Sequence, residues 1–245
     1  QKTAYEIKDG PFNDCGAFGS PNWLEFDPKY PHLVYVAADR GAGDENEGNG
    51  NMRILDLKNQ YVGTALTEGD MGGTNRGRAL AFFDENHMAV AVDQGDELRA
   101  AVYGFTRNRE APEGDERNYK MWGNRLALVN FKACNTVTFH PVDGDMYFNS
   151  WDKGQFFKVE KQQIQEIFDG TRTTPADKEV LFQMDNGWEY NIRIHPTGNY
   201  AYIVSINKHY IQRTNYDWAS KRFVTPFIVA GTAERAAYVD GIGTS

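Results

Sequence analysis

The chain has 245 residues and a formal net charge of −8 at pH 7, without any run of lysine or arginine, which disfavours nucleic acid and anionic membranes as partners. No apolar run approaches the ~20 residues of a membrane span. Aromatic residues make up 13% of the chain, and 24 glycines and 9 prolines supply many turns. This composition favours strands and tight turns over helices.

The two cysteines, Cys15 and Cys134, are too few for a zinc cluster and form no C-x-x-C pair. We expect two partly buried thiols and not a disulfide, because unpaired cysteines are commonly buried. They do not fix the compartment. No signal peptide is present and the chain begins at Gln1, so we expect that a segment before it was removed or lies outside this sequence.

One short pattern is written four times along the chain. Each copy has a strand ending in Phe or Ile, a polar tight turn, and a second strand of apolar residues. This turn chemistry and alternation predict a β-hairpin. We also expect the residues that end the first strand, Phe26, Phe139 and Ile194, to be buried. The copies are residues 26–36, 83–92, 139–148 and 194–203.

The spacing of the copies is regular, about 56 residues from one marker to the next, which is typical of β-propeller blades. The markers are Pro28, Glu85, Pro141 and Pro196. We predict an all-β fold, a β-propeller of four-stranded blades. The expected repeats are residues 10–65, 66–122, 123–177 and 178–231, with the start of a fifth at 232–245. Because Asp240-Gly241 echoes Asp9-Gly10 about four periods later, we interpret the chain as part of a larger ring.

In the first two repeats the alternation predicts strands at 33–38, 52–57 and 61–63, and then at 101–105. The polar stretch 39–51 is expected to be a loop. The charged insertion 107–119 is interpreted as a solvated loop. Residues 126–129 resume the β pattern and are placed at the start of the third repeat.

In the last two repeats, strands are expected at 155–159, 210–214 and 227–231. Between them the chain has one convincing helix, residues 161–168. Ile164, Ile167 and Phe168 lie on one face of this helix, and Gly170 is its stop signal.

Two histidines invite a metal interpretation. His140 and His195 occupy the turn position that Asp27 and Asp84 hold in the other copies. A zinc site needs ligands that converge on one point, whereas equivalent turns on successive blades diverge. We therefore expect each of these side chains to brace its own turn.

An oxygen-rich stretch could hold calcium, although its spacing departs from the EF-hand pattern. A solvated loop is the default interpretation. The calcium candidates are Asp44, Glu45, Glu47 and Asn49.

The chain shows no G-x-S-x-G motif and no Cys-His pair at a catalytic spacing. The residues before or at the start of the innermost strands suit contact better than proton transfer, because aromatic rings stack on a ligand while Arg and Asn hydrogen-bond to it. The alternative is that they only pack blade against blade. The candidate ligand-binding residues are Trp23, Arg76, Arg78, Asn135, Trp188, Glu189 and Tyr190. No cofactor is expected.

Several segments resemble NHL-type β-propeller repeats: Gly-x-Pro-x-x-Leu-x-Phe-Asp-Pro at 19–28, Leu-Val-Tyr-Val-Ala-Ala-Asp at 33–39 and Met-Arg-Ile-Leu-Asp-Leu at 52–57. Val-Ala-Gly-Thr at 229–232 and Tyr-Val-Asp-Gly-Ile-Gly-Thr at 238–244 are similar to the linkers between such blades. The chain is similar to surface lipoproteins of gut anaerobes, in which an immunoglobulin-like domain precedes a six-bladed propeller. Several of these are similar to accessory proteins of starch-utilisation-type nutrient importers.

The resemblance implies an extracellular or outer-membrane location, a lipid anchor outside these residues, and importer subunits as partners. We predict a protein that is not an enzyme and that binds a glycan or peptide, or docks on an outer-membrane nutrient transporter. Two alternatives stay open: a lyase or hydrolase acting at the central channel, and a purely structural interaction module. A metal held by inward-pointing His, Asp or Glu would favour the enzyme, and an aromatic, metal-free site would favour binding.

Overall fold

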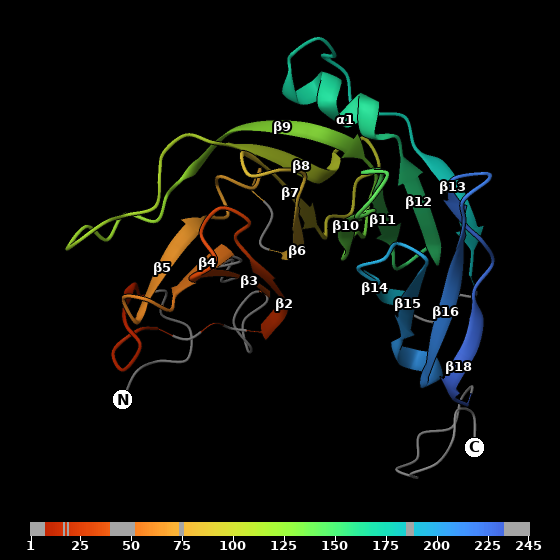
Figure 1. Ribbon diagram of the computed structural model, residues 1–245, viewed down its shortest axis with the longest axis horizontal. Helices are drawn as coiled ribbons and strands as arrows, with labels where there is room; N and C mark the ends of the chain where they lie inside the picture. The colour runs from red at the N-terminus through yellow and green to blue at the C-terminus, as the bar shows by residue number, and fades with distance from the viewer. Residues whose placement is uncertain are drawn as a thin grey trace. The chain divides into compact units, whose positions relative to one another are not determined.

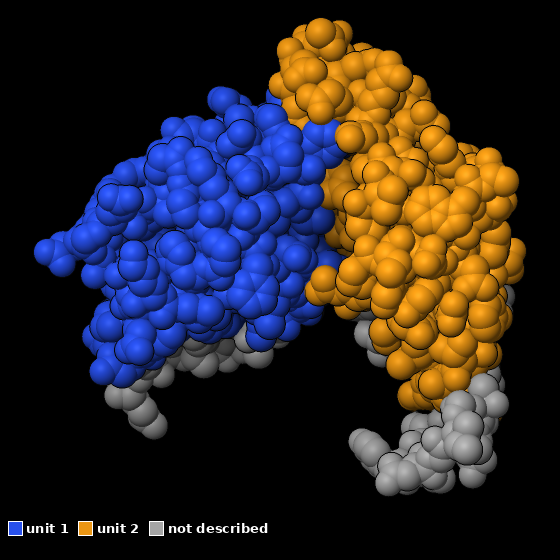
Figure 2. Space-filling model, in the orientation of Figure 1, with its two compact units in different colours: residues 1–132 blue, residues 133–245 orange. Residues whose placement is uncertain are grey.

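The computed structural model describes residues 8–16, 18, 20–39, 52–73, 76–184 and 189–232. The chain divides into two compact units, residues 1–132 and 133–245, which Figure 2 draws in different colours. Each unit contains two antiparallel sheets, and the order of their strands can be followed in Figure 1.

The first unit holds the first and second sheets. The first sheet has the strand order β1-β5-β4-β3-β2, formed by β1 (Gly10–Pro11), β2 (Ser20–Phe26), β3 (Leu33–Asp39), β4 (Met52–Asp56) and β5 (Tyr61–Leu66). The second sheet is a meander in sequence order, formed by β6 (Gly77–Phe82), β7 (His87–Val92), β8 (Ala100–Arg107) and β9 (Trp122–Asn130).

The second unit holds the third and fourth sheets. The third sheet is a meander of β10 (Val137–Phe139), β11 (Met146–Ser150), β12 (Gln155–Val159) and β13 (Glu179–Gln183). The fourth sheet runs through β14 (Glu189–Ile194), β15 (Tyr200–Ser205) and β16 (Tyr210–Asp217). Both β17 (Arg222–Phe223) and β18 (Phe227–Gly231) pair with β16. A short 3-10 turn, η1 (Ile206–Lys208), joins β15 to β16.

The predicted fold class is confirmed: the chain is all-β, with four successive antiparallel sheets built as the blades of a β-propeller. All four predicted hairpins form, as β2–β3, β6–β7, β10–β11 and β14–β15. One strand lies elsewhere than expected. Residues 126–129 belong to β9, which pairs with β8, so they complete the second sheet and do not open the third repeat.

The predicted helix is present with the expected bounds, as α1 (Lys161–Phe168). Ile164 and Ile167 are buried, and Phe168 is half-buried. Gly170 has a φ of +75°, a left-handed conformation that glycine adopts without steric cost, and it therefore ends the helix as expected. Among the described residues, no helix has the length and apolar character needed to cross a membrane.

The charged insertion at 107–119 differs from the expected solvated loop at both of its ends. Arg107 closes β8, and its side chain is only 2% exposed. Tyr119 is also buried; its ring stacks on Tyr61 and its hydroxyl donates a 2.8 Å hydrogen bond to Asp56 in the first sheet. The end of the insertion therefore packs on the first sheet, although the strands that the insertion connects, β8 and β9, belong to the second. Its local composition does not predict this long-range contact.

The expected burial of the first-strand ends is wrong for Phe26, which is 60% exposed, and only partly right for Phe139 and Ile194, which are half-buried. The register explains the difference. Phe26 lies opposite Val34, while the neighbouring pair joins Glu25 to Tyr35. Side chains alternate between the two faces of a strand, so Phe26 lies on the face away from Tyr35. The first and second sheets pack through the Tyr35 face, where the Tyr35 ring meets Phe82 edge-on at 5.4 Å.

The third and fourth sheets pack in the same way. Tyr147, Phe156 and Phe182 of the third sheet share one core with Ile192 and Ala201 of the fourth. Both cysteines carry thiols, half-buried at Cys15 and buried at Cys134.

Candidate functional site

Of the residues predicted to contact a ligand, Arg76 and Arg78 are brought together by a shared carboxylate. Arg76 precedes β6, Arg78 lies within it, and Asp93 follows β7, so all three lie at the same end of this hairpin. Arg76 Nη1 and Arg78 Nη2 both approach Asp93 Oδ2, at 3.1 and 2.9 Å. The Arg78 and Asp93 side chains are 9% and 7% exposed, whereas that of Arg76 is 29% exposed. Asp93 thus holds two guanidinium groups in place, and Arg76 is the one that reaches solvent.

Trp23 does not present an open ring to solvent, because it is 3% exposed. Its place in the register opposite Ala37 puts it on the same face of β2 as Glu25, the face that packs against the second sheet. The indole Nε1 donates to Glu25 Oε2 at 3.2 Å. Because β2 contacts β6, this tryptophan belongs to the buried interface between the first and second sheets.

The other predicted residues belong to the second unit. Asn135 precedes β10 and is 2% exposed, and its backbone N–H donates to Asn149 Oδ1 at 3.2 Å. Glu189 and Tyr190 open β14 as backbone. Trp188 and the calcium candidates Asp44, Glu45, Glu47 and Asn49 lie outside the described residues. Within the described ranges, no group of three or more His, Cys, Asp or Glu side chains is arranged to hold a metal ion.

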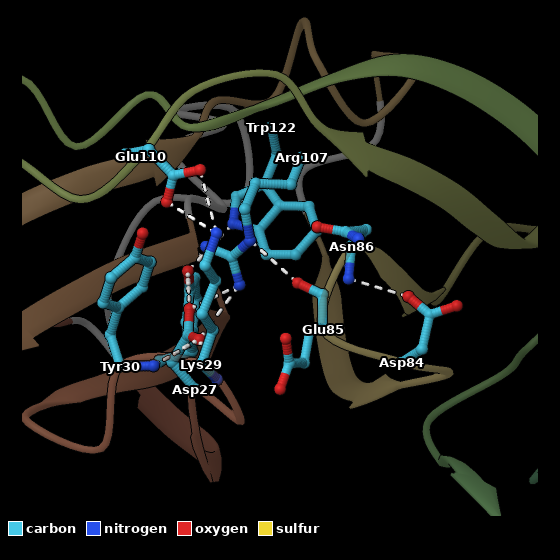
Figure 3. A network of polar contacts seen from close by, with 10 residues as sticks. Asp27, Lys29, Tyr30, Asp84, Glu85, Asn86, Arg107, Glu110 and Trp122 are labelled. Atoms are coloured by element: carbon cyan, nitrogen blue, oxygen red, sulfur yellow. Dashed lines mark hydrogen bonds and ion pairs between the residues drawn. The ribbon is translucent and has the colours of Figure 1, made fainter.

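A second polar cluster, which sequence reasoning did not find, surrounds Asp27 at the turn end of the β2–β3 hairpin (Figure 3). Asp27 is 1% exposed, and its carboxylate accepts hydrogen bonds from the backbone N–H groups of Lys29 and Tyr30 at 2.9 and 3.0 Å. It also accepts from the Tyr35 hydroxyl at 2.9 Å and from Arg107 Nη2 at 2.9 and 3.0 Å. These hydrogen bonds fix the buried carboxylate in position.

Arg107 reaches Asp27 from the second sheet. Its Nε donates to the carbonyl of Glu85 at 2.8 Å, and its guanidinium lies 4.4 Å from the ring centroid of Trp122. Trp122 Nε1 donates to the Tyr35 hydroxyl at 2.9 Å. Burial, followed by the charge of Asp27, raises the pKa of Tyr35 well above its ordinary value. We call the side chains of Asp27, Tyr35, Arg107 and Trp122 the Asp27 clasp. They join the first and second sheets.

The outer part of the same cluster is exposed. Lys29 Nζ pairs with Glu110 at 2.7 Å, at the rim of the Asp27 clasp (Figure 3). An exposed ion pair adds little to the free energy of unfolding, so most of the stabilisation from this contact between the two sheets comes from its buried part. The sequence marked Asp27 as a turn residue, but nothing near Arg107 indicated that it would be the partner, because the two are 80 residues apart.

His140 holds the equivalent position in the third sheet and braces its turn as predicted. Its Nδ1 accepts from the backbone N–H groups of Val142 and Asp143 at 3.3 and 3.1 Å, so Nε2 carries the proton and donates to the carbonyl of Gly198 at 3.0 Å. The imidazole stacks on Tyr216 of the fourth sheet, with ring centroids 4.1 Å apart. Gly198, at φ +76°, leaves room for this ring, because a Cβ there would lie 2.5 Å from His140 Cε1. We call this group the His140 clasp.

The other two turn residues also brace their own turns. Asp84 Oδ1 accepts from the backbone N–H of Asn86 at 2.7 Å, and His195 Nδ1 lies 2.8 Å from Thr197 Oγ1. The prediction that His140 and His195 brace their own turns is thus confirmed by the hydrogen bonds within each turn.

Neither a family model nor a curated protein matches the sequence. Solved structures do. An auxiliary nutrient binding protein from Bacteroides thetaiotaomicron is 32% identical over 98% of this chain and 48% of its own, with a TM-score of 0.76. One from Bacteroides ovatus is 27% identical over 98% of this chain and 49% of its own, with a TM-score of 0.74. A Bacteroides thetaiotaomicron protein named as a candidate phosphatase is 29% identical over 98% of this chain and 53% of its own, with a TM-score of 0.81.

These matches extend over nearly the whole chain, and the chain spans about half the length of each structure that it resembles. Two of the three carry a nutrient-binding name, which agrees with the class of function that the sequence predicted.

Proposed function

We propose that this protein is a nutrient-binding β-propeller of the cell surface, which captures a glycan or a peptide. The observation that carries this proposal is the similarity, at 32% and 27% identity over 98% of the chain, to two auxiliary nutrient binding proteins. A binding role also suits Arg76 and Arg78, whose guanidinium groups are held in place by Asp93.

The start of β6 is the part of the first unit best built for such a ligand. Two guanidinium groups fixed by Asp93 are preorganised donors, and planar guanidinium matches carboxylate or paired hydroxyl groups. Arg76, with 29% of its side chain exposed, contacts the ligand, whereas Arg78 and Asp93 position it. Trp23 is buried and therefore does not stack on the ligand. In the second unit, Asn135, Trp188, Glu189 and Tyr190 remain candidate contacts.

We further infer that the repeats are of the NHL type and that the protein is exported and held at the outer membrane by a lipid anchor outside these residues. Docking on a subunit of a nutrient importer is part of the same proposal. The nutrient-binding names of the two structural relatives support this placement.

The test is a calorimetric titration of the chain against a panel of neutral glycans, acidic glycans and short peptides. Arg76→Ala should weaken binding of any ligand found by about 1.5–3 kcal/mol, roughly 10- to 100-fold, the usual contribution of a charged hydrogen bond. Arg109→Ala is the matched control, because this arginine, with a side chain 35% exposed, pairs with Glu116 in the insertion. Equal affinity of Arg76→Ala and the parent chain would remove the site from β6. Turnover of a bound glycan or a phosphate ester would instead favour the hydrolase or lyase alternative.

A further inference from the structure

Trp218 lies in the turn between β16 and β17, and its large side chain is exposed and yet held in place. The residue is 45% exposed. Its indole Nε1 donates a 3.0 Å hydrogen bond to Asn199 Oδ1. Its ring meets those of Tyr216 and His140 nearly at right angles, with ring centroids 4.9 and 5.6 Å apart. These contacts fix the orientation of the indole, while almost half of the residue still faces solvent.

The first unit shows that the fold does not require an aromatic residue at this place. Arg107 in the second sheet and Tyr216 in the fourth hold equivalent positions. The backbone N–H of each donates at 2.8 Å to the carbonyl of the residue just before the second strand of its sheet, β7 or β15. Two residues further along, the second sheet has Arg109, which forms an ion pair with Glu116, whereas the fourth sheet has Trp218. The exposed tryptophan is therefore particular to the second unit and is not a property of the repeat.

The neighbouring hairpin turn of the third sheet differs from its counterpart in the same direction. Lys29 and Val142 are equivalent, since the N–H of each donates to the side chain two positions earlier, the acceptor of its turn. In the first unit, Lys29 pairs with Glu110 at the rim of the Asp27 clasp. In the second unit, Val142 is 61% exposed. The rim of the His140 clasp therefore carries an aromatic and an aliphatic side chain where the rim of the Asp27 clasp carries ion pairs.

Polar groups that can bind hydroxyls accompany these apolar side chains. The half-buried Asp143 accepts a hydrogen bond from the hydroxyl of Tyr216, the same tyrosine whose ring contacts Trp218. Its carboxylate has lone pairs for further donors. Asn199 is exposed and uses its Oδ1 for the indole, so its Nδ2 can donate to a ligand. An acceptor and a donor thus lie close to an indole of fixed orientation.

This combination suits a sugar ring better than an apolar peptide side chain. A pyranose has apolar C–H groups that pack on an aromatic ring, and hydroxyls that both donate and accept hydrogen bonds. An apolar side chain placed on Trp218 would cover the carboxylate of Asp143 and the amide of Asn199 without bonding to them, which costs free energy. The carboxylate also disfavours an anionic sugar, because like charges repel.

We propose that the second unit carries a binding surface for a neutral oligosaccharide, formed by Val142, Asp143, Asn199 and Trp218, which we call the Trp218 surface. One sugar ring packs on the indole. Its hydroxyls donate to Asp143 and accept from Asn199 Nδ2. The preorganised indole loses little conformational entropy on binding, as in other aromatic contact sites. This inference rests on the glycan branch of the proposed function and adds to it a second site, separate from the one at β6.

The first experiment observes the indole directly by fluorine NMR of the chain labelled with 5-fluorotryptophan. The resonance that is missing from Trp218→Phe is assigned to Trp218. Neutral gluco-, manno-, galacto- and xylo-oligosaccharides are the probes, with an oligogalacturonate and a short apolar peptide beside them. One of the neutral sugars should shift the Trp218 resonance to saturation, while the resonances of the buried Trp23 and Trp122 stay in place. No shift with any neutral sugar, or a shift with the peptide alone, overturns the proposal.

The second experiment measures the affinity for that sugar by calorimetry in the Arg76→Ala background, so that β6 does not contribute. Trp218→Ala should weaken binding about 10-fold or more, as at other aromatic hot spots. Trp218→Phe keeps a ring but loses the bond to Asn199, so it should weaken binding several-fold; it decides the matter if circular dichroism shows that Trp218→Ala is less folded. Phe12→Ala is the matched control, because this aromatic residue of the first unit is 42% exposed and should leave the affinity unchanged. Unchanged affinity in the Trp218 variants, or an equal loss in Phe12→Ala, overturns the proposal.

The two sites fail in different ways. A sugar that binds without shifting the Trp218 resonance, and whose affinity falls in Arg76→Ala alone, overturns the Trp218 surface and leaves the proposed function intact. A sugar that shifts the Trp218 resonance and binds Arg76→Ala as tightly as the parent chain supports the Trp218 surface and removes the site at β6. A chain that binds only peptides keeps the proposed function and overturns this inference.

Discussion

The Asp27 clasp and the His140 clasp occupy the same place in two pairs of sheets and solve the same packing problem with different chemistry. In the first unit the turn residue is a buried carboxylate and its partner is the guanidinium of Arg107. In the second unit the turn residue is a neutral imidazole and its partner is the phenol ring of Tyr216. In both, the turn residue accepts two backbone N–H groups from its own turn.

This difference separates two requirements of the contact, one set by the backbone of the turn and one set by the side chains of the neighbouring sheet. The hairpin turn presents N–H groups that any short acceptor can satisfy, so Asp and His are both suitable. The neighbouring sheet then has to match the charge of that acceptor, because a buried charge needs a partner and a neutral ring does not. The two clasps should therefore respond differently when they are broken.

Loss of the charged partner should have the largest effect. Arg107→Ala leaves the Asp27 carboxylate buried without its counter-charge, which should lower the free energy of unfolding by about 3–5 kcal/mol. Urea denaturation followed by circular dichroism measures this. Arg109→Ala should change it by less than about 1 kcal/mol, since its pair with Glu116 is exposed. Equal effects of the two variants would show that the Asp27 clasp does not hold the sheets together.

The aromatic clasp should be less costly to break. His140→Ala removes a buried ring, its bond to Gly198 and the acceptor of two backbone N–H groups, for an expected loss of about 2–4 kcal/mol. His195→Ala, at the equivalent position of the fourth sheet, should lose no more than about 1 kcal/mol because it has fewer contacts. Thermal and urea unfolding of both variants gives the comparison. A His195→Ala loss as large as that of His140→Ala would contradict it.

Removing the Tyr35 hydroxyl tests its role within the Asp27 clasp, where it links Asp27 of the first sheet to Trp122 of the second. Tyr35→Phe keeps the ring against Phe82 but removes the hydroxyl that donates to Asp27 and accepts from Trp122. The expected loss is about 1–3 kcal/mol, the usual cost of unsatisfied buried partners. Tyr202→Phe is the control, with an expected change within about 0.5 kcal/mol at its exposed position. The result is read from urea midpoints at constant slope, and similar losses in both variants would argue against the clasp.

The smallest expected effect concerns the stability of the protein at acidic pH, through Asp56. Burial acts to raise the pKa of Asp56, but hydrogen bonds from Asn59 and Tyr119 outweigh it, so this pKa is lowered. A lowered folded pKa gives stability that is present above the unfolded value of about 3.9 and is lost as pH falls through the folded value. Asp56→Asn should therefore cost about 1 kcal/mol at pH 7. It should also flatten the fall in stability below about pH 4. Urea unfolding from pH 3 to 7 measures both, and an acid limb as steep as that of the parent chain would contradict the assignment.

The sequence by itself determined what depends on short-range physics. Alternation and turn residues located the four hairpins, their spacing indicated the propeller class, and apolar periodicity with Gly170 predicted α1 at its observed bounds. The turn bracing by Asp27 and His140 was also readable, because a turn residue bonds to the backbone within three positions of itself.

Only the tertiary structure decided which faces are covered. Trp23 and Phe26 are both large and apolar and three positions apart in one strand, yet one is 3% and the other 60% exposed, because only one of the two faces packs on the second sheet. Arg107 carried every local sign of a solvated loop and became the buried partner of Asp27, 80 residues away. Such pairings form only when separate hairpins pack together. Their stabilisation depends on both of two segments that are far apart in the sequence, so it cannot be predicted from either segment alone.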